Sequence, residues 1–210
     1  RALRIICVTS PGPGEGKSTT AANLAITLAQ QGTRTLLVDA DLRRPLAHKA
    51  FNLVQEPGLT DILVGTATLR EAARPNVVPN LDVLPAGALP PNPSELLGSA
   101  AMHRLIEEMR AEYETVIFDS PPTLAVTDAS VLSASSDAAI LVVRAGETEE
   151  VAAQRALEQL RRVQARVAGV VLNGVERNSD RYYYYYDYRG GRKSSRGAIA
   201  NLRQRIANLL

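Results

Sequence analysis

Residues 10–18 of this 210-residue chain read Ser-Pro-Gly-Pro-Gly-Glu-Gly-Lys-Ser, and this stretch decides the fold. An apolar run, Arg4–Thr9, precedes it, and a helix-length segment, Ser18–Gln31, follows it. A strand, a glycine-rich turn and Gly-Lys-Ser at the start of a helix are the context of a phosphate-binding loop. Backbone amides and the positive end of the helix dipole hold phosphate there, and the lysine reaches the terminal phosphates. The sequence therefore predicts a nucleoside triphosphate site.

The loop departs from the usual pattern at one position, because Pro11 stands where a glycine is expected. Gly12 and Gly14 still let the backbone curl toward an anion. A surface turn that contains Gly-Lys-Ser by chance is the other interpretation, and the flanking strand and helix argue against it. With the Ser18 hydroxyl on Mg²⁺, the expected cofactor contacts are Gly12, Gly14, Glu15, Gly16, Lys17, Ser18 and Thr19.

Short apolar runs alternate with helix-length segments up to about residue 175. This alternation predicts an α/β fold, a doubly wound, mostly parallel sheet with helices on both faces. Nearly continuous apolar runs predict strands that are covered on both sides. The expected strands are Arg4–Thr9, Thr35–Asp39, Leu81–Leu84, Thr115–Asp119, Ala138–Val143 and Ala168–Asn173. The expected helices are Ser18–Gln31, Met102–Glu112 and Glu147–Gln164, and the proline-rich segment Pro85–Leu97 is expected to be a loop.

Carboxylates end two of the expected strands, at the edge where functional groups of such a sheet gather. Asp39 ends the second strand and Asp41 follows it, and Asp119 ends the fourth. An unpaired carboxylate at the end of a buried strand is costly, and Mg²⁺ with its waters would offset that cost. Asp41 has another interpretation, as the cap of a short helix near Pro45.

Other features of the sequence indicate which nucleotide binds and which classes of protein are excluded. No Asn-Lys-x-Asp guanine motif occurs, which favours ATP over GTP. Asn173, at the end of the last expected strand, is either an adenine contact or a turn residue. The single cysteine, Cys7, excludes an intramolecular disulfide and is expected in the core. No apolar run reaches the roughly 18 residues of a membrane span.

The C-terminal part differs in composition from the rest of the chain. Six of the seven tyrosines lie between Tyr182 and Tyr188. Six basic residues and no acid follow Tyr188, so the remaining residues carry a net charge of −4, against +2 for the whole chain. We expect an ATP-binding domain over residues 1–176, a flexible tyrosine-rich and basic tail over 177–197, and a short amphipathic helix over 198–210.

A run of phenols in a chain with a nucleotide site predicts a kinase that carries its own substrate. The expected autophosphorylation sites are Tyr182, Tyr183, Tyr184, Tyr185, Tyr186 and Tyr188. Each phosphate adds about −1.5 to −2 charges, so four would cancel or invert the positive charge of the tail. Polar–aromatic segments also serve as linkers or as stacking platforms for nucleic acids. That interpretation stays open, although no nucleic acid is expected as a partner.

Together the motifs resemble the bacterial tyrosine kinases of capsular and exopolysaccharide biosynthesis, P-loop enzymes related to the cell-division and plasmid-partition ATPases. The resemblance covers roughly residues 4–188. The loop at 10–19 and the tyrosine cluster carry it, together with three further motifs. These are Val-Asp-Ala-Asp-Leu-Arg-Arg-Pro (38–45), Pro-Pro-Asn-Pro-Ser-Glu-Leu-Leu (90–97) and Ile-Phe-Asp-Ser-Pro-Pro (117–122).

The resemblance implies a protein-tyrosine autokinase that transfers the γ-phosphate of ATP to tyrosines of a neighbouring copy. Lys17 would hold phosphate, and Asp41 would contact the metal or the incoming phenol. Mg²⁺ would be organised by Ser18, Asp39 and Asp119. The expected catalytic residues are therefore Lys17, Asp39, Asp41 and Asp119.

The family also implies partners and a location. Its members assemble as rings and pair with a membrane-spanning polysaccharide co-polymerase, fused or separate, that activates them. The kinase is cytoplasmic, at the inner face of the cell membrane, and a tyrosine phosphatase opposes it. Members usually carry a Glu-x-x-Arg-x-x-Arg helix used in ring assembly before the first strand, whereas this sequence begins at Arg1, almost on that strand.

Two other functions stay open at this point. A partition-type ATPase would use the nucleotide to gate dimerisation, and its tyrosines would be incidental. The signature lysine of that class is replaced by Gly12 here, which favours the kinase. A non-catalytic module would bind ATP only to hold a regulatory conformation.

Overall fold

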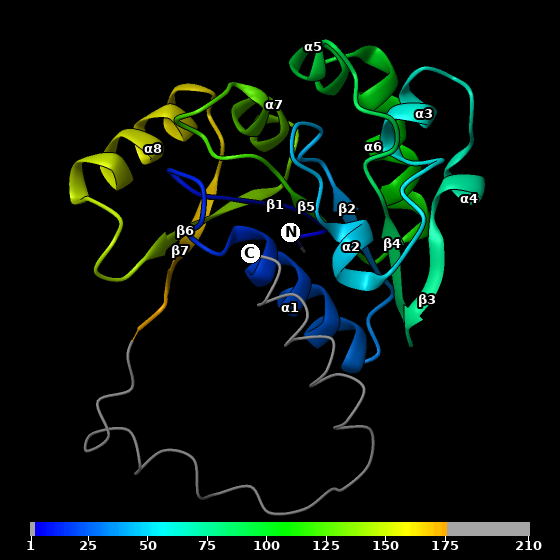
Figure 1. Ribbon diagram of the computed structural model, residues 1–210, viewed down its shortest axis with the longest axis horizontal. Helices are drawn as coiled ribbons and strands as arrows, with labels where there is room; N and C mark the ends of the chain where they lie inside the picture. Colours follow the sequence, from blue (N-terminus) through cyan, green and yellow to red (C-terminus); the bar gives the residue numbers. More distant parts are fainter. Residues whose placement is uncertain (1–2, 176–210) are drawn as a thin grey trace, which may run out of the picture.

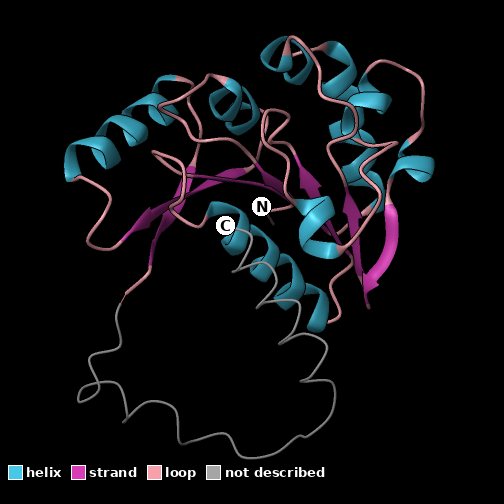
Figure 2. Ribbon diagram, viewed as in Figure 1, coloured by secondary structure: helices cyan, strands magenta, loops and turns pink. Residues whose placement is uncertain are grey.

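A seven-stranded sheet with helices on both faces forms the centre of the computed structural model, which describes residues 3–175 (Figures 1 and 2). The strands are β1 (Ile5–Thr9), β2 (Thr35–Asp39), β3 (Arg74–Val78), β4 (Leu81–Leu84), β5 (Thr115–Asp119), β6 (Ala138–Arg144) and β7 (Val167–Asn173). The helices are α1 (Lys17–Gln30), α2 (Ala47–Phe51), α3 (Leu59–Leu63), α4 (Leu69–Ala72), α5 (Pro93–Leu97), α6 (Ala100–Glu112), α7 (Asp128–Ala134) and α8 (Glu150–Arg162). The predicted fold class is confirmed.

The order of the strands brings the predicted site together. It is β3-β4-β2-β5-β1-β6-β7, and every neighbouring pair is parallel except β3 and β4. The strands β2, β5 and β1 are therefore adjacent, and their carboxyl ends lie at one edge of the sheet. Loops that leave this edge of a doubly wound sheet form its binding sites.

The central strands bury alternate side chains on opposite faces of the sheet. In β1, Val8 packs in the layer under α1 and α2, whereas Cys7 packs in the layer under α6 and α7. Ala139 of β6 is the register partner of Cys7 and packs against α8, so α8 covers the same face as α6. Figure 1 shows this division, with α1 on one side of the sheet and α6, α7 and α8 on the other. The expected place of Cys7 in the core is confirmed, because its side chain is fully buried.

Several short elements escaped the sequence analysis. The antiparallel strand β3 contains Pro75 and Asn76, which are poor strand formers, so its sequence carries no strand signal. The five helices α2, α3, α4, α5 and α7 have four to seven residues each, too short for a clear apolar period. The prediction that Pro85–Leu97 is a loop is wrong at its end, because α5 begins at Pro93, where the fixed φ of proline suits the first helical position.

The strand β7 forms one edge of the sheet, and its apolar side chains are largely exposed. Val170 is 52% exposed and Leu172 is 59% exposed. The prediction that this strand is covered on both faces is wrong, because α8 packs over β6 and Val167 and leaves the rest of β7 open. An apolar run alone does not distinguish an edge strand from a central one.

Within residues 3–175, no helix combines the length and the apolar character that crossing a bilayer requires. The predicted tyrosine-rich tail, its six phosphorylation sites and the C-terminal helix lie outside the described residues.

Candidate active site

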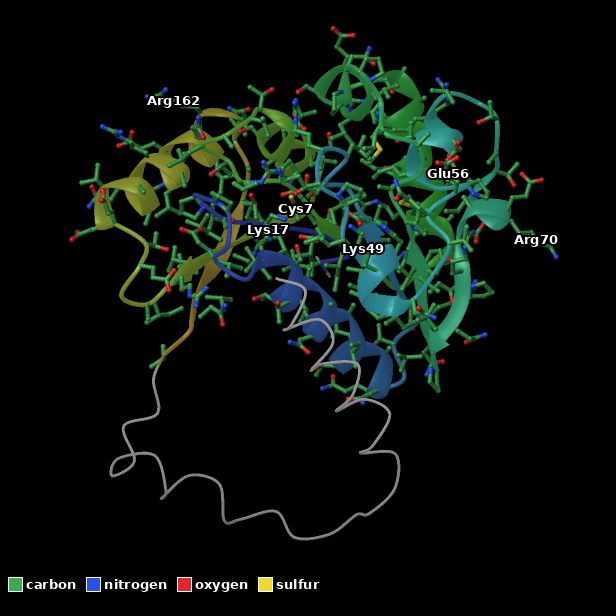
Figure 3. The ribbon with its side chains drawn as sticks, in the orientation of Figure 1. Cys7, Lys17, Lys49, Glu56, Arg70 and Arg162 are labelled. Atoms are coloured by element: carbon green, nitrogen blue, oxygen red, sulfur yellow. The ribbon has the colours of Figure 1, made fainter. Side chains whose placement is uncertain are left out.

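The phosphate loop joins β1 to α1 at the middle of the sheet. The helix begins at Lys17, and Gly16 before it has a φ of 91°, in the left-handed region that favours glycine. A Cβ on Gly16 would lie 2.0 Å from the Nδ2 of Asn173. Glycine is therefore needed here for its conformation and for space. Figure 3 shows Lys17 near the centre of the molecule, whereas the labelled Arg70 and Arg162 lie on its periphery.

The side chain of Glu15 braces the loop from within. Its Oε2 accepts a hydrogen bond from the backbone N of Gly12 at 3.1 Å. Its Oε1 accepts a hydrogen bond from the hydroxyl of Thr148 at 2.7 Å, so the loop is also fixed to the segment between β6 and α8. Glu15 was predicted as a cofactor contact, and this geometry shows it supporting the loop's backbone. Thr148 was not predicted, because no local motif marks it.

Two residues at the ends of β6 and β7 hold the loop from outside. Asn173 donates a hydrogen bond from Nδ2 to the carbonyl oxygen of Glu15 at 3.0 Å. Arg144 donates from Nη1 to the carbonyl oxygen of Gly14, also at 3.0 Å. Asn173 thus lies against the phosphate loop, next to the predicted nucleotide site. Arg144 was missed, because only the parallel pairing of β1 with β6 brings it to the loop.

The three predicted acids lie around Lys17. Its Nζ is 3.1 Å from the Oδ2 of Asp41 and 3.6 Å from the Oδ1 of Asp119, and it donates a hydrogen bond to the hydroxyl of Ser18 at 3.1 Å. Asp39 and Asp119 are register partners in β2 and β5. The structure therefore brings the predicted lysine, serine and acids into one cluster. Thr19 lies half-buried one residue further along α1.

Asp39, and not Asp41, caps the short helix α2. The Oδ2 of Asp39 accepts hydrogen bonds from the backbone N of Leu46 at 2.9 Å and of Ala47 at 2.8 Å. The Oδ1 of Asp41 accepts a hydrogen bond from the backbone N of Arg44 at 3.0 Å, within the turn before α2. The interpretation of Asp41 as the cap of this helix is wrong, because the strand end places Asp39 under the first amides of α2.

Burial governs the charge state of the cluster. Burial raises the pKa of Asp39, and the neighbouring charge of Asp119 raises it further. Burial also raises the pKa of Asp119, although the charge of Lys17 opposes this. For Lys17, burial favours a lower pKa, but the charges of Asp119 and Asp41 outweigh it and the pKa is raised. The cluster therefore contains more carboxyl groups than the single positive charge of Lys17 can neutralise.

The unsatisfied oxygens of the cluster fit a divalent cation. The Oδ1 atoms of Asp39 and Asp119 are buried and accept no hydrogen bond. Among residues 3–175, no group of three or more His, Cys, Asp or Glu side chains could hold a metal by itself. Mg²⁺ usually takes one or two carboxylates and completes its shell with water and substrate phosphates. Ser18, Asp39 and Asp119 would be the protein ligands of Mg²⁺, directly or through water.

A second ion pair anchors the segment that carries the acids. Arg43 donates from Nε and Nη2 to the two carboxylate oxygens of Asp128 at 2.9 and 3.2 Å. The hydroxyl of Ser94, from α5, also donates to Asp128, which is fully buried. The motifs at 38–45 and 90–97 are thus joined through the first residue of α7. This contact explains why an arginine follows Asp39 and Asp41 in the sequence. Asp128 was not predicted, because no local motif marks it.

Comparison with known proteins places this geometry in a family. A family model described as an AAA domain matches residues 3–171. The chain is 45% identical over 186 residues to the tyrosine-protein kinase YwqD of Bacillus subtilis, which covers 89% of this chain and 78% of that protein. It is 39% identical over 180 residues to EpsB of Ralstonia nicotianae, a putative tyrosine-protein kinase. That match covers 86% of this chain but only 24% of EpsB.

Solved structures agree with these relatives. The kinase domain of the Escherichia coli tyrosine kinase ETK superposes with a TM-score of 0.81 at 34% identity, over 87% of this chain and 72% of that one. The chimerical protein CapA2B2 gives a TM-score of 0.81 at 39% identity, over 83% of this chain and 77% of that one. The cell-division protein MinD of Pyrococcus horikoshii, complexed with Mg-ADP, gives 0.69 at 25% identity, over 81% and 70%.

The tyrosine kinases match at higher identity and with higher TM-scores than the cell-division ATPase does. YwqD alone, at 45% identity over most of both chains, is sufficient to assign the family. The chain belongs to the bacterial tyrosine kinases, a family of P-loop enzymes.

Proposed function

We propose that the chain is an ATP-dependent autokinase that phosphorylates the C-terminal tyrosine cluster of a neighbouring copy. One observation carries the proposal. Lys17, at the start of the helix behind a phosphate loop, lies 3.1 Å from Asp41 and 3.6 Å from Asp119. Phosphoryl transfer needs such a concentration of positioning and neutralising groups more than it needs covalent chemistry. The tyrosines of the same chain supply phenols at high effective concentration.

In this proposal the phosphate loop binds ATP through its backbone amides. Lys17 holds the terminal phosphates, while Ser18, Asp39 and Asp119 hold Mg²⁺. When bound, the cation neutralises charge on the phosphate oxygens and on the leaving diphosphate. Asn173 contacts adenine, and its hydrogen bond to the loop supports a role beside the nucleotide.

Asp41 is the proposed acceptor of the phenolic proton. Phosphates that bind Lys17 compete with its contact to Asp41 and free the Oδ2 of that residue. The phenolic oxygen then forms a bond to the γ-phosphorus, the bond from this phosphorus to the bridging oxygen breaks, and ADP leaves. Because a phenol has a pKa near 10, its proton passes to Asp41 late, as the new bond develops.

The proposed cellular role follows the family. The kinase acts in the cytoplasm at the inner face of the cell membrane, together with a membrane-spanning co-polymerase that is fused or separate. It associates with its own copies in a ring, and a tyrosine phosphatase resets it. The cycle regulates polymerisation and export of capsular or exopolysaccharide. The different shares of YwqD and EpsB that this chain covers are consistent with separate and fused arrangements.

A partition-type ATPase remains the alternative, because MinD shares the fold at 25% identity. Incubation of the full chain and its activator with ATP and Mg²⁺, followed by mass spectrometry, separates the two. Phosphate on residues 182–188 that is lost in Lys17→Met supports the kinase. Release of inorganic phosphate with unmodified tyrosines supports the ATPase and contradicts the proposal.

A further inference from the structure

A hollow of about 460 Å³ borders the phosphate loop on the side of α8. Its volume lies within the range of about 300–1,000 Å³ that is typical of ligand pockets. The loop contributes Gly12, Pro13 and Glu15 to its wall, and the segment that follows Asp119 contributes Leu124 and Ala125. In Figure 1 the blue connection between β1 and α1 lies below α8.

The hollow is distinct from the cluster that the proposed mechanism assigns to phosphate and metal. Lys17, Ser18 and Asn173 do not line it. It lies between the loop that holds phosphate and the segment that leaves Asp119. A group bound in it is therefore next to the nucleotide without occupying the contacts of Lys17, Ser18 or Asn173, as a phosphate acceptor must be.

The lining of the hollow is suited to a phenol with a cationic neighbour. Leu124 is 40% exposed, and Ala125 and Ala152 add further apolar surface, against which an aromatic ring can pack. The exposed side chain of Glu149, directly before α8, supplies negative charge, whereas Glu147 is paired with Arg144 at 3.0 Å. The tyrosine cluster is the matching ligand, because Arg181 and Arg189 flank its phenols.

We propose that this hollow is the acceptor-docking site, which takes one tyrosine of a neighbouring copy's tail and holds a flanking arginine at Glu149. The inference rests on the proposed function and adds to it the surface that recognises the substrate. Because Thr148 also lines the hollow and bonds Glu15, an occupied docking site contacts the same brace that shapes the phosphate loop.

A transfer assay between two full-length variants tests the site. The donor carries phenylalanine at all six cluster tyrosines, so it cannot be labelled, and the acceptor carries Lys17→Met, so it cannot transfer phosphate. Glu149→Arg or Ala152→Phe in the donor should slow labelling of the acceptor by about three- to tenfold, with an unchanged Kd for ATP. The same changes in the acceptor should have no effect. Glu150→Arg, at a neighbouring residue that does not line the hollow, is the matched control.

Binding is measured separately with a fluorescent peptide of residues 178–192 by anisotropy. Glu149→Arg should weaken it by about the same factor at low salt, and about 0.5 M salt should remove the difference. Unchanged peptide affinity in both donor variants overturns the docking site. A weaker Kd for ATP in Ala152→Phe also overturns it, because the hollow would then belong to the nucleotide. The donor that carries only the six phenylalanine substitutions is the reference. If it binds the peptide but does not label the acceptor, the proposed kinase activity is wrong and the docking site is still supported.

Discussion

Asp39 and Asp119 occupy register-paired positions on β2 and β5, and each keeps one buried oxygen without a hydrogen bond. Burial raises the pKa of both carboxyl groups, and the charge of Asp119 raises the pKa of Asp39 further, so ionisation of both destabilises the fold. The fold therefore tolerates an electrostatic cost at the point where the proposed Mg²⁺ would bind.

That cost predicts an unusual pH dependence of stability. An acid whose native pKa lies above its unfolded value of 3.8 binds more protons in the folded state, so stability falls as pH rises from about 4 toward the native pKa. Without Mg²⁺, the free energy of unfolding in urea should be lower at pH 8 than at pH 5.5. Asp39→Asn should raise it at pH 8 by about 1–2 kcal/mol and flatten the slope.

The control for this prediction is Glu107→Gln, which removes an equally charged side chain that is 73% exposed. It should leave both the slope and the stability at pH 8 within about 0.5 kcal/mol of the wild type. An Asp39→Asn protein that loses stability at pH 8 would contradict the electrostatic account.

Gly16→Ala should damage the nucleotide site more than Gly14→Ala. Both residues have a positive φ, so each alanine costs roughly 1–2 kcal/mol of backbone strain. Only at Gly16 does the new Cβ also meet Asn173, whereas the Cβ at Gly14 meets open space. The Kd for ATP, measured by calorimetry, should therefore rise at least about tenfold more for Gly16→Ala. Equal effects of the two substitutions would show that the contact with Asn173 is unimportant.

Thr148→Val should weaken ATP binding although Thr148 touches no nucleotide in the proposed complex. The substitution keeps the shape of the side chain and removes the hydroxyl that donates to Glu15. Because a hydrogen bond typically contributes a net free energy of about 0.5–1.5 kcal/mol, a Kd for ATP about twofold to tenfold higher is expected. Thr148→Ser retains the donor and should restore the affinity. If serine and valine behave alike, the hydrogen bond does not shape the loop.

Asp137 should control stability in acid. Burial opposes its ionisation, but hydrogen bonds from Arg110 and from the backbone N of Ile5 and Arg4 lower its pKa to about 2. A lowered pKa gives stability that is present above pH 4 and is lost as pH falls toward 2. Asp137→Asn should therefore cost about 1–3 kcal/mol at pH 7 and less at pH 2.5, measured by urea unfolding. A constant cost across this range would exclude the ion pair as its source.

The sequence predicted the parts of the fold that have strong local signals. Six strands are apolar runs, and three long helices have a clear period, so each was found to within a few residues. The strand β3 was missed because its pairing with β4, rather than its own residues, makes it a strand. The exposure of β7 could not be read from its valines, because it depends on the position of that strand in the sheet.

The same division holds for the site. Asp39 and Asp119 end their strands and Asp41 follows close behind, while Lys17 and Ser18 begin the helix after the phosphate loop. The sheet topology therefore brings them together once the fold class is known. Arg144, Thr148 and Asp128 act through contacts that join segments far apart in the chain. Their roles depend on register and loop geometry, and no spacing in the sequence encodes them. Whether Asn173 contacts adenine stays a prediction.

The course of the chain behind β7 has a practical consequence. This strand runs parallel to β6, and β6 to β1, so Asn173 and Val175 leave the sheet at the edge from which the phosphate loop departs. Any polypeptide grafted behind Val175 begins beside the catalytic edge, whatever its sequence. Foreign peptides can therefore be fused behind Val175 in place of the natural segment. Comparing such fusions tests which peptide sequences the domain is able to phosphorylate.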